Sequence, residues 1–209
     1  MNEPSPLPVP DGDRKTLDYY DQRGQDFFDR TVGLNVPHIL QPFLERVPHG
    51  GHILDAGCGS GRESKLFLDR GYRVTAFDGS ATMARLASAY IGQPVQHLTF
   101  DQMNFEGEFD GIWACATLLH VPLNDLPGVF ERFIRALKPG SVWFASFKWG
   151  SGERQTEEGR RFTDFDDNTF RAFAARFPAL TLEQLWQNSD GRPEAQGGLW
   201  LNALLRRQP

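Results

Sequence analysis

The chain has 209 residues and a formal net charge of −5 at pH 7, the size of one ordinary domain that can bury a core. Hydrophobic residues make up 40% of the chain and charged residues 23%, as in a globular protein. No basic excess is available to neutralise phosphates, which argues against nucleic acid as the main partner, and no apolar run approaches the ~20 residues of a membrane span.

The N-terminus and the cysteines indicate the compartment. Residues 1–13 hold four prolines and lack the build of a signal peptide, so they predict a flexible leader. Cys58 and Cys115 both fall at the ends of expected strands, so we do not expect a disulfide framework. No cluster of His, Cys and Asp at ligand spacing indicates a metal. We expect a cytoplasmic monomer or homodimer with one domain, residues 14–209.

The first elements are helical. Residues 13–30 carry aromatic side chains at roughly helical spacing, and 36–47 form a second helix with Pro37 in its first turn. We therefore expect an N-terminal helical cap, residues 14–48. A buried strand at 52–56 follows, and after it a helix to Arg70.

Further strands alternate with helices along the rest of the chain. Apolar runs predict strands at 72–77, 95–100, 109–115, 142–147, 180–186 and 199–205, and helices at 80–90 and 124–137. Residues 150–167 predict a long polar loop, which is more often functional than idle, and Asp167 then caps a helix ending at Phe177. This alternation implies a parallel sheet with right-handed crossovers.

The most informative stretch is residues 55–62, Asp-Ala-Gly-Cys-Gly-Ser-Gly-Arg. Glycines at a turn between a strand and a helix let the backbone approach a ligand closely, and the helix start supplies N–H groups for an anion. Asp78 ends the next strand about 20 residues beyond the turn, where an acid can accept hydrogen bonds from ribose hydroxyls. Arg62 stands where the third glycine of the dinucleotide fingerprint would fall. The stretch predicts a nucleotide-type pocket.

Three ordered motifs carry a family resemblance. Asp55-x-Gly57-x-Gly59-x-Gly61, the strand-ending Asp78 and Leu137-Lys138-Pro139-Gly140 resemble the class I S-adenosylmethionine (SAM) dependent methyltransferases, over nearly the whole chain. The resemblance implies an α/β fold: a Rossmann-like, seven-stranded, mostly parallel sheet with helices on both faces and an antiparallel last strand. Among these enzymes the pattern is similar to the small stand-alone tellurite-resistance and quinone-type methyltransferases.

The resemblance also implies a reaction. SAM would be the cofactor and S-adenosylhomocysteine the product, with the methyl group passing to a small-molecule acceptor by in-line displacement. No nucleic acid or membrane partner is implied. The accepting atom is not specified by any motif, because a fold does not fix its chemistry.

The cofactor would lie at the carboxyl ends of the strands. The residues expected to bind it are Tyr20, Asp55, Gly57, Cys58, Gly59, Gly61, Arg62, Asp78, Gly79, Met83, Asp101, Gln102, Cys115 and Ala116. By resemblance, Asp55 would order the loop and reach the methionine amino group, and Asp78 would hold the ribose. Asp101 and Gln102 would read the adenine amino group, unless Asp101 is a solvated loop acid. Met83 either covers the adenine or belongs to the core.

His120 is the candidate catalytic residue. It follows the fourth strand, where the family places the transferable methyl, and imidazole can act as a general base near neutral pH. The alternative is a structural role, because a sulfonium is a good leaving group and alignment of the nucleophile can suffice. Cys115 is not expected to be a covalent nucleophile, since the reaction needs no enzyme intermediate.

The acceptor side is expected at the first helix and after the fifth strand. The candidate substrate residues are Tyr19, Lys148, Trp149 and Arg161. Tyr19 and Tyr20 resemble a tyrosine pair that closes over the cofactor, or are ordinary helix aromatics. If the loop after the fifth strand folds inward, Arg154, Arg160 and Arg161 can bind an oxyanion or carboxylate; otherwise these are solvated charges.

Two other functions remain open. A nicotinamide-dependent oxidoreductase shares the strand, turn and ribose acid, although Arg62 and the helical leader count against it. A non-catalytic SAM-binding module would keep the pocket and show no turnover.

Overall fold

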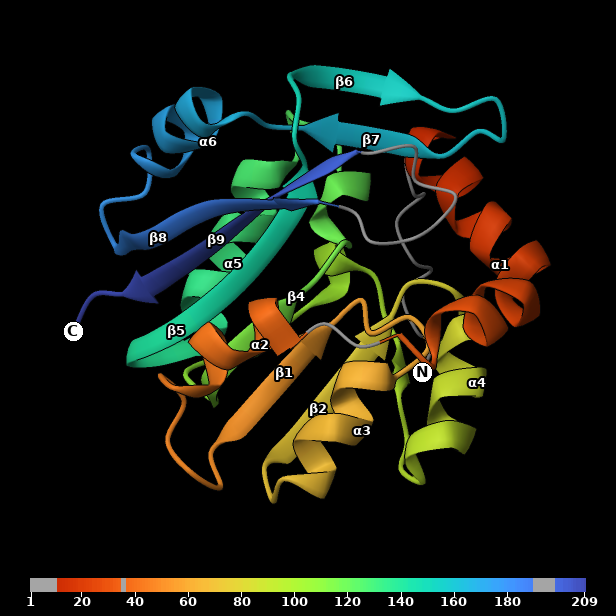
Figure 1. Cartoon of the computed structure of the whole chain (residues 1–209), viewed down its shortest axis with the longest axis horizontal. Coiled ribbons are helices and arrows are strands. Elements are labelled where there is room, and N and C mark those ends of the chain that lie inside the picture. Colours follow the sequence, from red (N-terminus) through yellow and green to blue (C-terminus); the bar gives the residue numbers. More distant parts are fainter. Residues whose placement is uncertain (1–10, 35–36, 190–197) are drawn as a thin grey trace, which may run out of the picture.

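The computed structural model describes residues 11–34, 37–189 and 198–209. Residues 1–10 of the expected leader and residues 190–197 between the last two strands lie outside these ranges. A seven-stranded sheet runs through the molecule in the order β3-β2-β1-β4-β5-β9-β8 (Figure 1). Its strands are β1 His52–Ala56, β2 Arg73–Asp78, β3 Gln96–His97, β4 Phe109–Ala114, β5 Leu137–Lys148, β8 Leu180–Ser189 and β9 Leu199–Arg207.

The strand directions confirm the expected fold class. The pairs within β3-β2-β1-β4-β5 are all parallel, whereas β9 is antiparallel to both β5 and β8. The sheet is therefore Rossmann-like and mostly parallel, with the last strand antiparallel.

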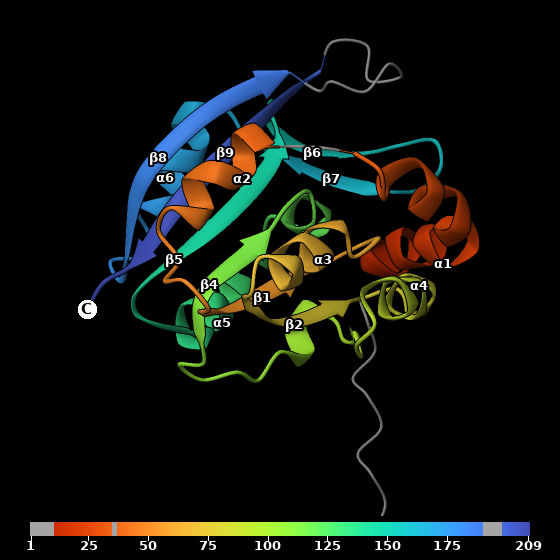
Figure 2. The ribbon, with the colours of Figure 1, turned by 60° about the horizontal axis from the view of Figure 1, so that its bottom comes forward.

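Helices cover both faces of this sheet, as Figure 2 shows. They are α1 Asp11–Thr31, α2 Pro37–Leu44, α3 Arg62–Asp69, α4 Ala81–Ile91, α5 Leu126–Ala136 and α6 Asp167–Ala174. Successive strand residues point to opposite faces, so Leu54 packs with α5 and α6 while Ile53 packs with α2 and α3. No helix in the described ranges combines the length and apolar character needed to cross a bilayer.

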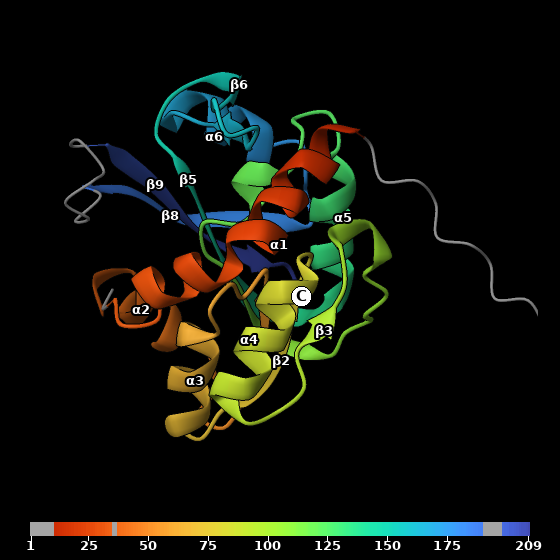
Figure 3. The same ribbon diagram turned by 90° about the vertical axis from the view of Figure 1, so that its right-hand side faces the viewer.

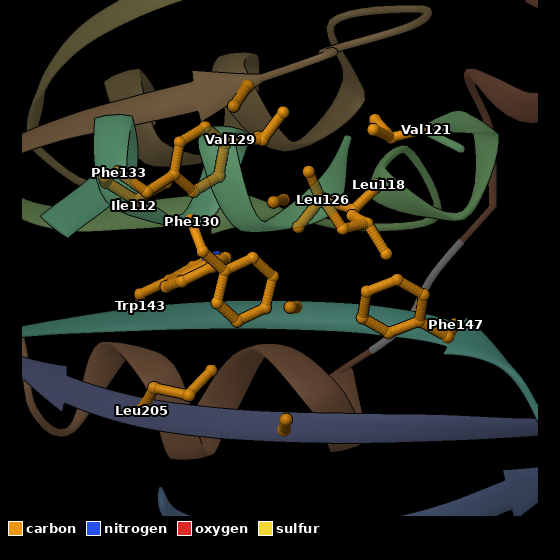
Figure 4. Close-up of a cluster of buried hydrophobic side chains, with 14 of the residues drawn as sticks. Ile112, Leu118, Val121, Leu126, Val129, Phe130, Phe133, Trp143, Phe147 and Leu205 are labelled. Atoms are coloured by element: carbon orange, nitrogen blue, oxygen red, sulfur yellow. The ribbon is translucent and has the colours of Figure 1, made fainter. Parts of the chain in front are cut away.

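Aromatic side chains fill the core under α5 (Figure 4). The rings of Phe130 and Phe133 on α5 lie 4.4 and 4.8 Å from that of Trp143 on β5, measured between centroids, and all three side chains are fully buried. Edge-on aromatic pairs add to the stabilisation that burial provides. These tightly packed rings therefore hold α5 against the middle of β5.

The predicted third strand is wrong beyond His97. Only Gln96–His97 pair with β2, and Phe100–Gln102 form a 3-10 helix, η1. The backbone N–H of Thr99 donates to Oε1 of Gln102 at 3.0 Å. This side-chain bond satisfies the backbone locally, as a capping box does, and takes the chain out of the sheet.

The predicted loop at 150–167 is also wrong. Gly152–Gln155 (β6) and Arg161–Asp164 (β7) form an antiparallel hairpin. The hydroxyl of Thr163 donates to the carbonyl of Val121 at 2.7 Å, which ties the hairpin to the body of the domain. The cap of α6 is Asp166, one residue before the predicted one, and it accepts from the N–H of Thr169 at 2.8 Å.

The two N-terminal helices play different parts. α2 packs on the sheet through Phe43 and its neighbours, whereas α1 lies along α4 (Figures 1 and 3). Oδ1 of Asp21 accepts from the hydroxyl of Ser80 at 2.6 Å and from the N–H of Thr82 at 3.1 Å. A Cβ at Gly24 would lie 2.5 Å from Cγ2 of Thr82, so glycine is what allows the close approach. Of the expected cap, α1 is the part docked at the start of α4.

Candidate active site

A cleft of about 1810 Å³ opens at the carboxyl ends of β1, β2, β4 and β5. Its other walls come from α1 and the β6–β7 hairpin, and open α/β sheets bind their ligands at this position. The predicted residues that line it are Tyr19, Tyr20, Gly57, Cys58, Gly59, Arg62, Asp78, Gly79, Met83, Asp101, Cys115, Ala116, His120 and Lys148. Predicted residues that lie far apart in the sequence, from Tyr19 to Lys148, thus meet in one cavity.

Asp55 and Gly61 support the glycine loop from behind the cleft wall. Asp55 is 2% exposed, and Oδ2 accepts from the hydroxyl of Ser64 at 2.6 Å. Burial, followed by the negative charge of Glu63, raises the pKa of Asp55 to about 8. Gly61 is the N-cap of α3 and lies close to Ala87 of α4. Both residues fix the shape of the loop.

Three other predicted side chains also lie outside the cleft lining. Gln102 closes the η1 turn. Trp149 is 45% exposed and donates from Nε1 to Asp167 at 3.1 Å. Arg161 pairs with Glu153 at 2.9 Å.

Asp78 links the glycine loop to the start of α4. Oδ2 accepts from the N–H of Gly59 at 2.8 Å and Oδ1 from the N–H of Ser80 at 2.9 Å. Burial raises the pKa of Asp78 to about 6, against the effect of these two bonds. Each carboxylate oxygen can accept a further hydrogen bond, so two neighbouring ribose hydroxyls match this group.

Gly57 brings the loop against the segment after β4. It has φ +70°, and a Cβ there would lie 1.9 Å from Oγ1 of Thr117. Only glycine satisfies both conditions. Thr117 is thus a wall residue of the cleft that the sequence pattern did not identify.

Arg62 connects α3 to the end of α1. It forms an ion pair with Glu63, its Nε lying 2.7 Å from Oε1, and NH1 donates to the carbonyl of Thr31 at 3.3 Å. Its charge is therefore partly compensated within the cleft wall.

His120 sits at the centre of a hydrogen-bonded chain through three elements. It ends the 3-10 helix η2 (Leu118–His120). Its Nδ1 lies 2.7 Å from the carbonyl oxygen of Arg161, and Nε2 lies 2.9 Å from the hydroxyl of Tyr20. Because a carbonyl only accepts, Nδ1 carries the proton and Nε2 accepts from Tyr20.

Both members of this pair are neutral near pH 7. Burial lowers the pKa of His120 to about 4. Burial raises the pKa of Tyr20 to about 12, although the positive charge of Arg160 opposes the shift. The imidazole has both nitrogens engaged, which suits positioning better than proton abstraction.

The segment after β4 also holds Cys115 and Ala116. Burial raises the pKa of Cys115 to about 12, which keeps the thiol protonated and poorly nucleophilic. Ala116 has φ +54°, a region that non-glycine residues seldom occupy. Its N–H donates to the hydroxyl of Ser146 at 2.8 Å, which helps to hold this strained turn.

Two lining residues missed by the sequence analysis sit opposite each other. Ser146 on β5 pairs in register with Asn202 on β9. Asn202 is buried and donates from Nδ2 to Oδ1 of Asn188 at 2.6 Å. A buried polar residue within an apolar strand needs hydrogen-bond partners. Ser146 and Asn202 each stand among apolar residues in the sequence, and this pattern could have identified them.

The comparisons with known proteins point to one family. Residues 53–140 match a family model described as a methyltransferase domain. The chain is 30% identical over 119 residues to a 2-heptyl-1-hydroxyquinolin-4(1H)-one methyltransferase of Mycobacteroides abscessus, covering 53% of this chain and 52% of the relative. It is 38% identical over 104 residues to a ubiquinone biosynthesis O-methyltransferase of Pseudomonas aeruginosa, covering 46% and 44%. The chain thus spans about half the length of the curated relatives it matches.

A solved structure extends the likeness to the whole fold. It is the 1,6-didemethyltoxoflavin-N1-methyltransferase of Burkholderia thailandensis, bound to 1,6-didemethyltoxoflavin and S-adenosylhomocysteine. The TM-score is 0.76 at 22% identity, covering 98% of this chain and 93% of that one. Residues 53–140 thus match a methyltransferase domain by sequence, and the likeness to this structure shows the same fold over nearly the whole chain.

Proposed function

We propose that this protein is an enzyme that transfers a methyl group from SAM to a small-molecule acceptor. The observation that carries the proposal is the bond from the Gly59 N–H to Asp78, which shapes the glycine loop at the floor of the cleft. This arrangement offers close backbone approach and a ribose-binding acid together.

The cleft lining fits the parts of this cofactor. Gly57 and Gly59 leave room for the methionine part, and Asp78 faces the ribose position. Met83 and Asp101 line the end expected for the adenine. When bound, SAM supplies an electrophilic methyl carbon with a thioether leaving group.

The chain itself then has to bind, align and exclude water. With the leaving group already activated, alignment supplies much of the rate, and we propose an in-line displacement. His120 acts in this scheme by fixing the Tyr20 hydroxyl at the cleft wall, because its Nε2 is already used as an acceptor.

Small acceptors are supported by the relatives. Their names give a hydroxyquinolinone and ubiquinone biosynthesis as the settings of methyl transfer. Aromatic side chains also line this cleft, among them Tyr19, Phe27, Phe162 and Trp200. The proposal includes a cytoplasmic location, no nucleic acid or membrane partner, and a monomer or homodimer, as charge and cysteine content suggest.

Calorimetric titration with S-adenosylhomocysteine and, separately, NADH tests the proposal. We expect binding of S-adenosylhomocysteine alone. Binding of NADH alone would mean that the Gly57–Arg62 loop holds a dinucleotide, and binding of neither would remove the cofactor assignment. If the cofactor product binds but a broad panel of acceptors shows no turnover, the chain is a SAM-binding module and not an enzyme.

A further inference from the structure

The β6–β7 hairpin presents alternate residues to the cleft. Arg160 and Phe162 line it, whereas the side chain of Arg161 between them pairs with Glu153 outside it. This is the alternation expected of a strand. The N–H of Arg161 donates to Oγ1 of Thr16 on α1 at 3.0 Å, so the hairpin is fixed on the side of the cap helix. Arg160 is therefore part of a built wall.

The guanidinium of Arg160 lies over two aromatic rings. Its Cζ lies 4.3 Å from the ring centroid of Tyr19 and 5.5 Å from that of Phe162. Cation–π contacts of this kind attract a guanidinium to ring faces, and its N–H groups can still form paired hydrogen bonds to a carboxylate. The same group interacts with the hydroxyl of Tyr20 and favours its ionised form. Arg160 thus reaches the part of the cleft around Tyr20 and His120.

The two cleft arginines of the hairpin differ in how they are neutralised. Arg154 bonds both carboxylate oxygens of Asp164, through Nε at 2.5 Å and NH2 at 3.4 Å; the Asp164 side chain is 9% exposed and that of Arg154 is 48% exposed. NH2 of Arg160 lies 2.9 Å from Oε2 of Glu158, whose side chain is 42% exposed. Exposed ion pairs contribute about 0–1 kcal/mol, and a ligand oxyanion inside the cleft can replace such a partner.

Arg160 also makes fewer hydrogen bonds than it can. None of the described residues accepts from its buried Nε–H. A guanidinium has five N–H donors and remains charged at every relevant pH. Its charge is thus less completely compensated than that of Arg154.

We propose that the methyl acceptor is a small organic anion whose oxyanion lies against the edge of the Arg160 guanidinium, beside Tyr20. The inference names the substrate class of the site and rests on the proposed methyl transfer. It places the anion on Arg160 and not on Arg161, which the sequence had suggested.

The test uses anion probes on the complex with S-adenosylhomocysteine. Benzoate, phenylphosphonate and the neutral benzamide are titrated calorimetrically into the full chain at saturating S-adenosylhomocysteine, for the wild type, Arg160→Gln and Arg161→Gln. Arg161→Gln is the matched control, because it removes a neighbouring charge outside the cleft and keeps the backbone carbonyl that holds His120. Circular dichroism and S-adenosylhomocysteine affinity report whether each variant is folded.

We expect at least one anion to bind and benzamide not to bind. Arg160→Gln should weaken anion binding about tenfold or more, as expected when a charge-assisted bond is lost, while Arg161→Gln leaves it unchanged. The preference between benzoate and phenylphosphonate identifies the oxyanion. Three outcomes would overturn this inference and leave the proposed methyl transfer intact. They are equal binding of benzoate and benzamide, no binding of either anion, and equal losses of anion binding in both variants.

Two outcomes separate this inference from the proposed function. Failure of the wild type to bind S-adenosylhomocysteine would overturn methyl transfer itself. Weaker S-adenosylhomocysteine binding in a folded Arg160→Gln variant would assign Arg160 to the cofactor carboxylate, which also overturns its role at the acceptor while leaving the proposed function intact.

Discussion

Gly57 illustrates how single atoms set the shape of the cleft. Its positive φ could be tolerated by alanine at a cost of about 1–2 kcal/mol, but the contact with Thr117 could not, because the added Cβ would meet Oγ1 at 1.9 Å. The residue therefore combines two constraints, one on backbone conformation and one on space. Only the constraint on space involves a residue that lines the cleft, Thr117.

A pair of alanine variants separates these constraints. Gly71 also has a positive φ, +82°, yet a Cβ there would have nothing within 4 Å. We expect Gly71→Ala to lower the free energy of unfolding by about 1–2 kcal/mol without changing S-adenosylhomocysteine affinity. Gly57→Ala should in addition lose most of that affinity, measured by calorimetry.

A double variant tests whether the clash with Thr117 causes the loss of affinity. Removing the Thr117 side chain, as in Gly57→Ala with Thr117→Gly, should restore part of the affinity because the clash is gone. Equal affinities for the Gly57→Ala and Gly71→Ala variants would show that the close approach to Thr117 does not matter for the cofactor.

At the scale of elements, the chain from Tyr20 through His120 to Arg161 connects α1, η2 and β7. Tyr20 and His120 lie 100 residues apart in the sequence. Their bond and the bond from His120 to the Arg161 carbonyl together join two walls of the cleft, α1 and β7, to η2. Both groups are neutral near pH 7 because burial disfavours their charged forms. The cleft wall is thus closed by a neutral hydrogen-bonded chain and not by an ion pair.

Tyr20→Phe tests the contribution of this chain. Loss of the hydroxyl leaves Nε2 of His120 buried without its donor, which should destabilise the protein by about 1–3 kcal/mol. Urea denaturation measures this change, and hydrogen exchange should show faster opening of α1. Tyr19→Phe is the matched control, since the Tyr19 hydroxyl takes no part in the chain. An equal loss in the control would mean that general packing of α1, and not the bond to His120, is responsible.

The strands could be predicted where the sequence contains a continuous apolar run. β1, β4 and β5 were found in this way because their side chains are buried on both faces of the sheet. The β6–β7 hairpin was missed because its sequence is polar, and its order comes from partners far along the chain, such as Val121 for Thr163. Tertiary bonds of this kind leave no local periodicity.

The same distinction applies to the site. Gly57, Gly59 and Asp78 follow fixed spacing along one strand-turn-helix-strand unit, so sequence could place them in the cleft. Arg160 and Arg161 are adjacent, and only the register of β7 decides which one lines the cleft. The partnership of Tyr20 and His120 depends on how α1 docks, which no short-range pattern encodes.

At the scale of the whole molecule, buried acids make stability depend on pH. The pKa of Asp55 is raised to about 8 in the folded protein from its ordinary value of 3.8. Between these values the folded protein holds a proton that the unfolded chain has released. The contribution of Asp55 to the free energy of unfolding is therefore present at low pH and is lost as pH rises towards 8.

Asp55→Asn should remove this dependence. The amide oxygen can still accept from Ser64, and it cannot ionise. Urea denaturation at pH 5 and pH 8 should show the variant gaining stability relative to wild type at the higher pH. Asp69→Asn is the control, because its side chain is 60% exposed. Parallel pH profiles for wild type and Asp55→Asn would contradict a raised pKa at Asp55.

The position of β9 has a consequence for synthesis on the ribosome. β8 is translated before β9, yet in the sheet β9 lies between β5 and β8. While the chain emerges, β8 has no strand to pair with, and one edge of β5 stays open until β9 leaves the exit tunnel. Non-local pairing of this kind is slow and exposes unpaired backbone to other chains. For this protein, the vulnerable interval therefore lasts from the emergence of β8 until β9 pairs, when an edge-binding chaperone would have its target.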